Sequence, residues 1–152
     1  MPISERISTA NELRAWTDSI PFHYEYTAGV AGEKFLRGLV EGKILAAKCD
    51  NCGKKYLPPK TYCVDCYLPT TGYVSVGSKG VVGALALSHV SFEGRRLSKP
   101  KQFAFVTFRG VTGGLVHYAR GKGLKVGSEV EARFKPEKAR RGSLLDIEEF
   151  VS

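Results

Sequence analysis

The hydrophobic and polar positions of this 152-residue chain predict helices before residue 45 and strands after residue 72. Residues 32–43, GEKFLRGLVEGK, carry apolar side chains at helical spacing with charged side chains between them. This apolar stripe consists of Phe35, Leu36, Leu39 and Val40. Because such a stripe is stable only when covered, we expect the helix to lie against the rest of the fold or a partner.

A shorter helix is predicted upstream, in residues 9–16. Thr9 opens this segment and Glu12 follows three residues later, which is the pattern of a capping box. We therefore assign residues 1–45 to an N-terminal helical segment.

After residue 72 the pattern changes to strands. In the best-defined segment Val130, Ala132 and Phe134 alternate with charged residues, as in a half-buried strand with a period of two. Similar runs, rich in β-branched and aromatic residues, are separated by glycine-containing turns. The predicted strands cover residues 80–92, 103–109, 114–120, 128–136 and 144–151. Five strands within about 75 residues, with no long helix among them, favour a small closed barrel.

All four cysteines of the chain lie in residues 49–66, CDNCGKKYLPPKTYCVDC. Two CxxC pairs separated by ten residues suit a structural metal site, in which each pair sits in a tight turn. Gly53 supplies the positive φ that such a turn requires, and the linker is long enough to bring the pairs together. The predicted cofactor is zinc, although iron can occupy the same four-thiolate site. The predicted ligands are Cys49, Cys52, Cys63 and Cys66.

The net charge of +8 is concentrated in the C-terminal half, where residues 91–141 carry 13 basic and 4 acidic groups. This excess indicates an acidic partner, such as nucleic acid, a phosphorylated cofactor or an acidic protein surface. A solvated surface tuned for solubility explains the same charge. A loop-like stretch in residues 91–102 and the connection in residues 120–125 hold the candidate ligand-binding residues Arg95, Arg96, Lys99, Lys101, Arg120, Lys122 and Lys125. A third basic group comprises Lys135, Lys138, Arg140 and Arg141.

Catalytic groups are sparse in this sequence. The histidines, His23, His89 and His117, are scattered, and no phosphate-binding loop or nucleophile elbow is present. Asp146 and two neighbouring glutamates are predicted to form the polar side of the last strand. The sequence therefore predicts that the protein is not an enzyme.

No apolar run approaches the roughly 20 residues that a membrane span requires. The N-terminal residues also lack the layout of a secretory signal. We therefore expect a cytoplasmic protein without membrane contact, in a compartment where thiols stay reduced and favour metal binding over disulfides.

The segment FLRGLVEGKILAAKCDNCGKKYLPP, followed by YCVDC, resembles the opening of the acyl-CoA-associated zinc-ribbon and OB-fold proteins. This family, long described as a domain of unknown function, is similar to the chain over residues 31–150. The second CxxC turn departs from the family pattern, because Val64 stands where proline is frequent and Tyr67 where glycine is frequent. The resemblance implies a mainly β fold with N-terminal helices, a rubredoxin-like ribbon in residues 46–72 and a five-stranded OB-fold barrel in residues 73–152.

Members of this family associate with acyl-CoA enzymes, notably thiolases, and some bridge a thiolase and hydroxymethylglutaryl-CoA synthase. They have also been suggested to bind acyl-CoA through the barrel and ribbon. The resemblance thus implies a non-catalytic accessory subunit with a thiolase or synthase-like partner, and it allows contact with acyl-CoA or coenzyme A.

The alternative is a zinc-ribbon and OB-fold module that binds single-stranded nucleic acid. Such binding uses basic residues together with exposed aromatic side chains on which bases stack. The aromatic candidates in the barrel are Phe103, Phe105, Phe108, Tyr118 and Phe134. Alternation along the strands predicts that most of them belong to the core.

Overall fold

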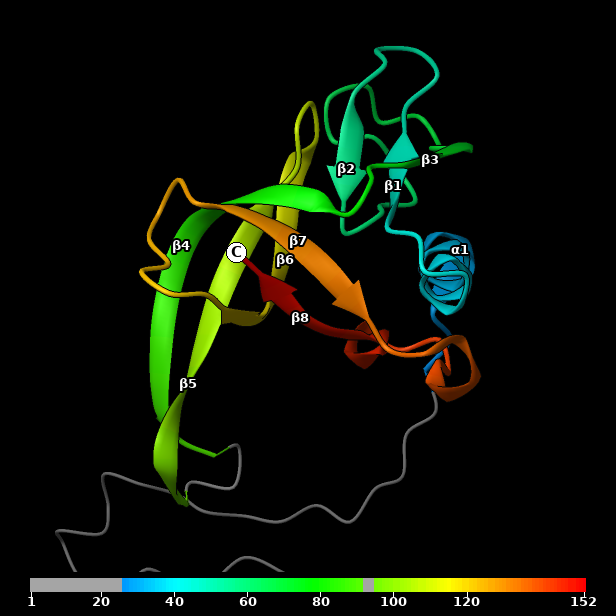
Figure 1. The fold of residues 1–152 in the computed structure, drawn as a ribbon. Coiled ribbons are helices and arrows are strands. Elements are labelled where there is room, and N and C mark those ends of the chain that lie inside the picture. The colour runs from blue at the N-terminus through cyan, green and yellow to red at the C-terminus, as the bar shows by residue number, and fades with distance from the viewer. Residues whose placement is uncertain (1–25, 92–94) are drawn as a thin grey trace, which may run out of the picture.

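The computed structural model describes residues 26–91 and 95–152. The helix predicted for residues 9–16, and His23, lie outside the described residues. Figure 1 shows a mainly β structure in which a small ribbon and one α-helix lie to one side of a barrel. The elements are α1 (Gly29–Val40), β1 (Leu45–Lys48), β2 (Lys55–Leu57), β3 (Gly72–Ser75), β4 (Lys79–Val90), β5 (Arg96–Thr107), β6 (Thr112–Arg120), β7 (Glu129–Phe134), η2 (Glu137–Ala139), η3 (Leu144–Asp146) and β8 (Ile147–Val151).

Strands β4 to β8 close into a barrel. β4 pairs with β5, β5 with β6, β6 with β8, β8 with β7, and β7 returns to β4. Every pair is antiparallel except β6 and β8, which run parallel. The predicted fold, mainly β with a zinc-ribbon segment followed by a five-stranded OB-like barrel, is therefore confirmed.

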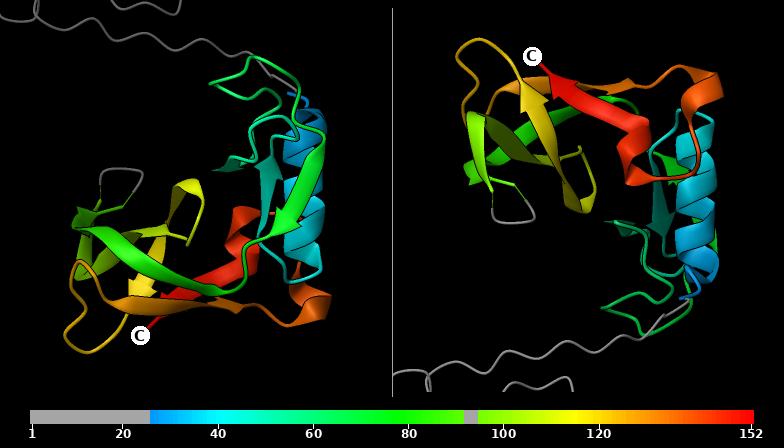
Figure 2. Two further views of the ribbon diagram at one scale, coloured as in Figure 1. Left: turned by 90° about the horizontal axis from the view of Figure 1, so that it is seen from above. Right: turned by 90° about the horizontal axis from the view of Figure 1, so that it is seen from below.

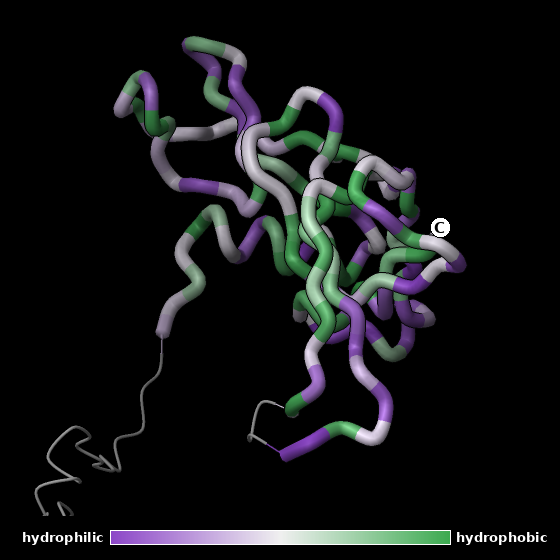
Figure 3. Tube along the Cα trace, turned by 90° about the vertical axis from the view of Figure 1, so that its left-hand side faces the viewer, coloured by the Kyte–Doolittle hydropathy of each residue, from purple (hydrophilic) through white to green (hydrophobic). Residues whose placement is uncertain are grey.

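The hairpin of β4 and β5 corrects the prediction of a loop in residues 91–102. β5 already begins at Arg96, which pairs with Val90, and Lys101 pairs with Ser88. Figure 3 shows this hairpin reaching beyond the body of the barrel, where neither face packs against other strands. Apart from the half-buried Leu97, the side chains of residues 96–101 are exposed, so this part of the strand carries no alternation of apolar and polar residues that would have predicted it.

Helix α1 ends at Val40, earlier than the predicted Lys43. Gly42 follows in the left-handed region with a φ of 74°. The amide of Lys43 donates to the carbonyl of Gly38 at 2.8 Å, and the amide of Gly42 donates to Leu39 at 3.0 Å. These two bonds form a Schellman motif, which stops the helix where glycine tolerates the turn.

The buried face of α1 packs against the ribbon and the barrel. Phe35 and Leu39 are buried, as the helical stripe predicts, whereas Val40 is exposed. At Gly38 an added Cβ would lie 2.7 Å from Cγ of Leu45, so glycine permits the helix to approach β1 closely. No helix in the described part of the chain is long and apolar enough to cross a membrane.

The connection between β7 and β8 lies beside α1, as both views in Figure 2 show. Arg140 joins the two segments, because its side chain donates to the carbonyls of Lys135 at 2.7 Å and Val40 at 3.2 Å. Its guanidinium also lies over the ring of Phe134, 5.5 Å from the centroid. Arg140, a member of the third basic group of the sequence, therefore links the connection between β7 and β8 to the end of α1.

Asp146 lies in the same connection and is buried, which corrects its assignment to the polar side of the last strand. Its carboxylate accepts hydrogen bonds from the backbone amides of Arg141, Gly142 and Ser143 at 2.7–3.1 Å. Burial acts to raise the pKa of Asp146, but these amide bonds outweigh it and hold the pKa below its usual range. The carboxylate thus shapes the loop that covers α1.

The ribbon and the barrel share one sheet and one core. β2 pairs in parallel with β6, with Tyr56 opposite Thr112 and Leu57 opposite Gly113. At Gly113, whose φ is 92°, an added Cβ would lie 2.2 Å from the carbonyl oxygen of Leu57. Leu57 and Ala46 of the ribbon belong to the same buried cluster as the barrel interior. The division into residues 1–45, 46–72 and 73–152 stays a prediction.

Candidate functional site

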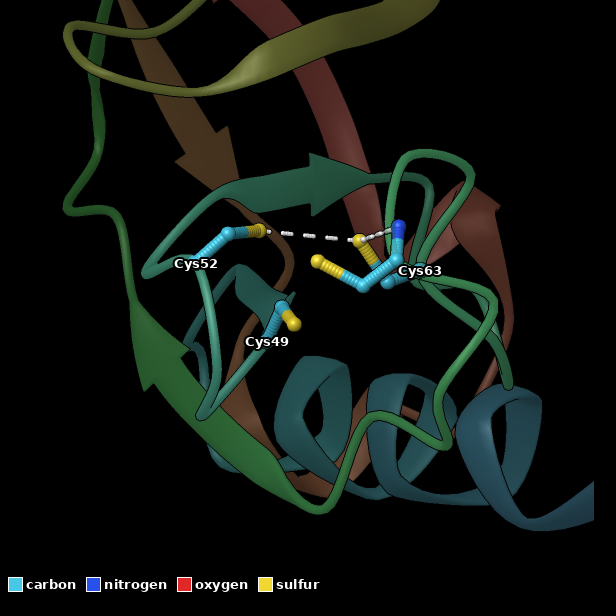
Figure 4. Close-up of side chains that lie close together, drawn as sticks. Cys49, Cys52 and Cys63 are labelled. Carbon is cyan, nitrogen blue, oxygen red and sulfur yellow. Dashed lines mark hydrogen bonds between the residues drawn. The ribbon is translucent and has the colours of Figure 1, made fainter.

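The structure brings all four cysteines together at the end of the ribbon. Their sulfur atoms lie within 4.8 Å of one another, and Sγ of Cys52 and Cys63 are 3.6 Å apart. Figure 4 shows Cys49, Cys52 and Cys63 turning their sulfurs towards a common centre. Cys49 and Cys63 are buried, whereas Cys52 is exposed, so the cluster opens to the surface on one side.

The first CxxC turn follows directly from β1. The amide of Cys49 donates to the carbonyl of Lys54, and the amide of Gly53 donates to the carbonyl of Cys49, both at 2.9 Å. Gly53 has the predicted positive φ, at 70°. These bonds fold the chain back tightly enough to point both sulfurs of the pair inward.

The second turn repeats the same bonds at a distance of 14 positions along the chain. The amide of Cys63 donates to Leu68 at 2.9 Å, and the amide of Tyr67 donates to Cys63 at 3.0 Å. Tyr67 occupies the place of Gly53 and also has a positive φ, at 59°. A bulky side chain in this region costs about 1–2 kcal/mol relative to glycine.

Polar groups around the cluster support the thiolate form. Nδ2 of Asn51 donates to Sγ of Cys66 at 3.3 Å. The oxygen of the Tyr56 hydroxyl lies 3.2 Å from Sγ of Cys63. The amide of Cys66 donates to the same sulfur at 3.4 Å. Thiolates are the form that binds metal, so these contacts prepare the site for its ion.

A tyrosine, a carboxylate and a lysine fix the second turn from outside. The Tyr56 hydroxyl donates to Oδ2 of Asp65 at 2.6 Å, and Nζ of Lys54 pairs with Oδ1 at 2.8 Å. The bond from Lys54 is the largest cause of the lowered pKa of Asp65, and the bond to Asp65 raises the pKa of Tyr56. The sequence analysis did not identify Tyr56 and Asp65. The only indication in the sequence was the position of Asp65 between the two cysteines of CVDC.

The chemistry and spacing of this donor set fit zinc. Tetrahedral zinc with sulfur at 2.3 Å places neighbouring sulfurs about 3.8 Å apart. The 3.6 Å between Sγ of Cys52 and Cys63 is close to this value, and all four sulfurs lie within 4.8 Å of one another. When bound, zinc would cross-link the two turns. Its four positions would be filled by Cys49, Cys52, Cys63 and Cys66, as in structural rather than catalytic sites.

Two of the seven candidate residues for an acidic ligand meet in one cleft. Lys101 and Arg120 line a hollow of about 630 Å³ on the barrel surface. Arg133, Glu148 and Glu149 line it as well, whereas the other five candidates do not. Of the seven candidates only this pair lines the cleft, and the binding of an acidic ligand stays a prediction.

The charges in this cleft are largely paired. Glu149 lies 2.6 Å from Nη2 of Arg120 and 2.5 Å from Nη2 of Arg133, and Glu148 lies 3.0 Å from Nε of Arg133. Nζ of Lys101 lies over the ring of Tyr118, 5.2 Å from its centroid. The cleft therefore combines a cation and an aromatic ring beside a balanced ion-pair network.

The barrel aromatics divide between the two faces, which corrects the prediction that most lie in the core. Phe108 is buried, and Phe134 packs against the core from a half-buried position. Phe103, Phe105 and Tyr118 alternate with the buried Ala104, Val106, His117 and Ala119, so they lie on the outer face. Phe103 pairs with Tyr118 across the strands, with ring centroids 4.7 Å apart.

The two described histidines do not form a pair with a catalytic arrangement. His89 is exposed on β4, whereas His117 is buried in the barrel. Nε2 of His117 lies 3.2 Å from the carbonyl oxygen of Leu144, and its Nδ1 has no partner among the described residues. Burial lowers the pKa of His117. These contacts suit a packed histidine.

Comparisons with known proteins match the chain over the ribbon and over most of the fold. A family model described as "ChsH2, rubredoxin-like zinc ribbon domain" matches residues 37–67, which include both CxxC pairs. No curated protein sequence matches the chain significantly.

Two solved structures are similar to most of the fold. One is a protein of unknown function of the DUF35 family from Sulfolobus solfataricus, with 34% identity and a TM-score of 0.62 over 72% of this chain and 81% of that chain. The other belongs to a structure described as "Ltp2-ChsH2(DUF35) aldolase", with 17% identity and a TM-score of 0.58 over 70% of this chain and 85% of that chain. The latter likeness shows the fold alone. By its identity to the Sulfolobus protein and its matching ribbon, this chain belongs to the DUF35 family of rubredoxin-like zinc-ribbon proteins.

Proposed function

We propose that the chain is a non-catalytic accessory subunit of a thiolase-like enzyme that acts on acyl-CoA thioesters. The observation that carries this proposal is the shared fold with a DUF35 chain found in an Ltp2–ChsH2(DUF35) aldolase. The family membership and the matching zinc ribbon support it. A hydroxymethylglutaryl-CoA synthase-like enzyme is a further partner in this proposal, and the complex would work in the cytoplasm, where the thiols stay reduced.

The geometry of the described residues supports a structural role for the metal. Four cysteine sulfurs converge on one point, so a bound ion would have no open position for substrate or water. The ring of His117 is buried and directed at the carbonyl of Leu144. Catalysis would then belong to the partner enzyme.

Coenzyme A would contact the barrel at the cleft that contains Lys101 and Arg120. Its phosphates are strongly anionic, and lysine and arginine side chains bind phosphate oxygens with charge-assisted hydrogen bonds. The remaining candidates, Arg95, Arg96, Lys99, Lys122 and Lys125, would add long-range attraction. In this proposal the barrel assists the partner in holding the nucleotide end of its substrate.

Affinity purification of the tagged, full-length chain from a nuclease-treated lysate of its native host tests the proposal. We expect a thiolase-like or synthase-like enzyme in near-equal amounts, and no acyl-CoA turnover by the chain alone. Turnover by the purified chain would overturn the non-catalytic role. Failure to retain such an enzyme under these conditions would overturn the accessory role.

One observation favours a second candidate, the binding of single-stranded nucleic acid. Phe103 and Tyr118 form an aromatic pair on the outer face of the barrel with Lys101 beside it. Both rings are half-buried, and bases stack on aromatic side chains whose faces are accessible at a protein surface. Fluorescence polarisation with a labelled oligonucleotide tests this candidate, which predicts salt-dependent binding that a Tyr118→Ala change weakens. Absence of binding at low salt would exclude it.

A further inference from the structure

The second CxxC turn presents apolar side chains to solvent. Tyr62, Val64, Tyr67 and Leu68 are 59%, 48%, 82% and 48% exposed. A backbone bridge between Tyr62 and Pro69 closes this loop, and the hydrogen bonds of Cys63 hold its interior. Four exposed apolar residues thus lie within seven positions of one turn, and we name them together the knuckle patch.

The two turns differ in side chains while sharing their backbone bonds. The first turn exposes Asn51, Gly53 and Lys54, which are polar or lack a side chain. Gly53 and Tyr67 occupy equivalent places and both have a positive φ, of 70° and 59°. Glycine would therefore satisfy the backbone conformation at both positions. Because the side chain of Tyr67 is 82% exposed, packing inside the ribbon does not explain it. Tyr67 therefore combines a strained backbone with a side chain that is free to contact another molecule.

We propose that the knuckle patch, Tyr62, Val64, Tyr67 and Leu68, is the surface that docks on the catalytic subunit. This inference rests on the proposed accessory function. Tyrosine is among the residues that contribute most to protein interfaces, because it buries a large rigid surface at small entropic cost. The metal-linked turn holds the patch in one shape before binding, which reduces the entropy lost on association.

Charge decides between a partner subunit and a second copy of this chain. The ribbon contains Lys48, Lys54, Lys55 and Lys60 against Asp50 and Asp65, and this excess of two balances the charge of −2 that four thiolates and a zinc ion would carry. The whole chain is nevertheless basic, with a net charge of +8 that a zinc ion bound to four thiolates would lower by two. Asp65 is already paired with Lys54. Two copies meeting at the knuckle patch would bring two basic chains together, which disfavours self-association. The partner that fits is a protein of acidic net charge with an apolar pocket.

The substitution Tyr67→Gly separates stability from binding. Glycine relieves the strained φ, so the variant should keep its metal and unfold at the same or a higher temperature than the wild type. Its affinity for the thiolase-like subunit should nevertheless fall roughly tenfold or more, as for an interface hot spot. Val64→Ser is a second variant with the same expected loss. Val126→Ser, at a 61% exposed position outside the ribbon, is the matched control and should bind like the wild type.

The measurement is calorimetric titration of each full-length, metal-loaded variant with the thiolase-like subunit that co-purifies with the wild type. Loss of affinity in Tyr67→Gly and Val64→Ser, with the control unchanged, supports the inference. Wild-type affinity in both variants overturns the inference and leaves the accessory function standing. If the wild type binds no thiolase-like subunit, the accessory function fails and the inference fails with it. If sedimentation shows that the chain self-associates and that Tyr67→Gly abolishes this, the occupant is a second copy and the inference is wrong.

Discussion

The ribbon and the barrel are stabilised by different interactions. Buried in the ribbon's own cluster are Cys49, Tyr56 and Cys63, with Cys66 packed against them, so most of that cluster consists of metal ligands. The barrel instead buries a continuous set of aliphatic and aromatic side chains that includes Val82, Val106, Leu115, Ile147 and Phe150. A segment as small as the ribbon cannot bury enough apolar surface to fold alone and needs a metal. Ligation therefore stabilises the ribbon, and burial stabilises the barrel.

The two regions are nevertheless joined at the base of the ribbon. Ala46 and Leu57 lie in the barrel's core, and β2 is hydrogen-bonded to β6. Loss of the metal or of core packing in one region can therefore be tested for its effect on the stability of the other.

Loss of the metal should have the largest effect. We expect Cys49→Ser to release the metal and unfold the ribbon, because a structural zinc site contributes about 10–16 kcal/mol to the folding of a small domain. The barrel strands should remain, since their interior lacks metal ligands. Metal analysis combined with amide hydrogen exchange resolved by residue measures both effects. Cooperative loss of protection in β4 to β8 would contradict the two-part architecture and show that the shared base couples the regions.

Replacing a large side chain in the barrel core by alanine should destabilise the barrel and leave the metal site intact. Phe150 is fully buried, and Phe150→Ala should reduce the free energy of unfolding by about 3–5 kcal/mol. Metal content of the folded fraction should stay unchanged, because the cysteine cluster lies outside the barrel interior. Denaturant titration and metal analysis give the two readouts. Val116→Ala, at an exposed position on β6, is the matched control and should change stability by less than about 0.5 kcal/mol.

The buried carboxylate of Asp146 should stabilise the barrel in a manner that depends on pH. Asp146→Asn should cost about 1–2 kcal/mol at neutral pH, because it weakens the hydrogen bonds from three backbone amides. The folded-state pKa of Asp146 is lowered, so its contribution is present above the unfolded pKa of about 4 and is lost as pH falls through the folded pKa. Stability curves of the two proteins should therefore converge in acid. A constant difference across this range would show that the charge plays no part.

The smallest effect concerns His117. Its folded-state pKa is lowered by burial, so the unfolded state binds more protons below the unfolded pKa of about 6.5. Stability should decrease as pH falls through this range, and His117→Leu should flatten that dependence whatever its effect on absolute stability. Thermal unfolding at several pH values measures the slope. An unchanged slope in the variant would assign the dependence to other groups.

Patterns with a local cause were predictable from the sequence. The CxxC spacing indicated the cysteine cluster because each pair lies within one short turn. Helical periodicity located α1 and alternation located β7, because burial on one face gives the sequence a regular period. Runs rich in β-branched and aromatic residues located the other four barrel strands. The extension of β5 to Arg96 shows neither pattern, since both of its faces are largely exposed there.

The sequence by itself thus determined the ligand set, the element types and the family resemblance, all of which depend on short-range spacing. The tertiary structure alone decided that Asp146 is buried, that Phe103 and Tyr118 face outward, and that Arg140 joins the last connection to α1. It also decided that Tyr67 repeats the backbone of Gly53. Each of these facts depends on which distant segment, or which face of the closed barrel, meets the residue, and contacts between residues far apart in the chain leave no periodic signal in one sequence.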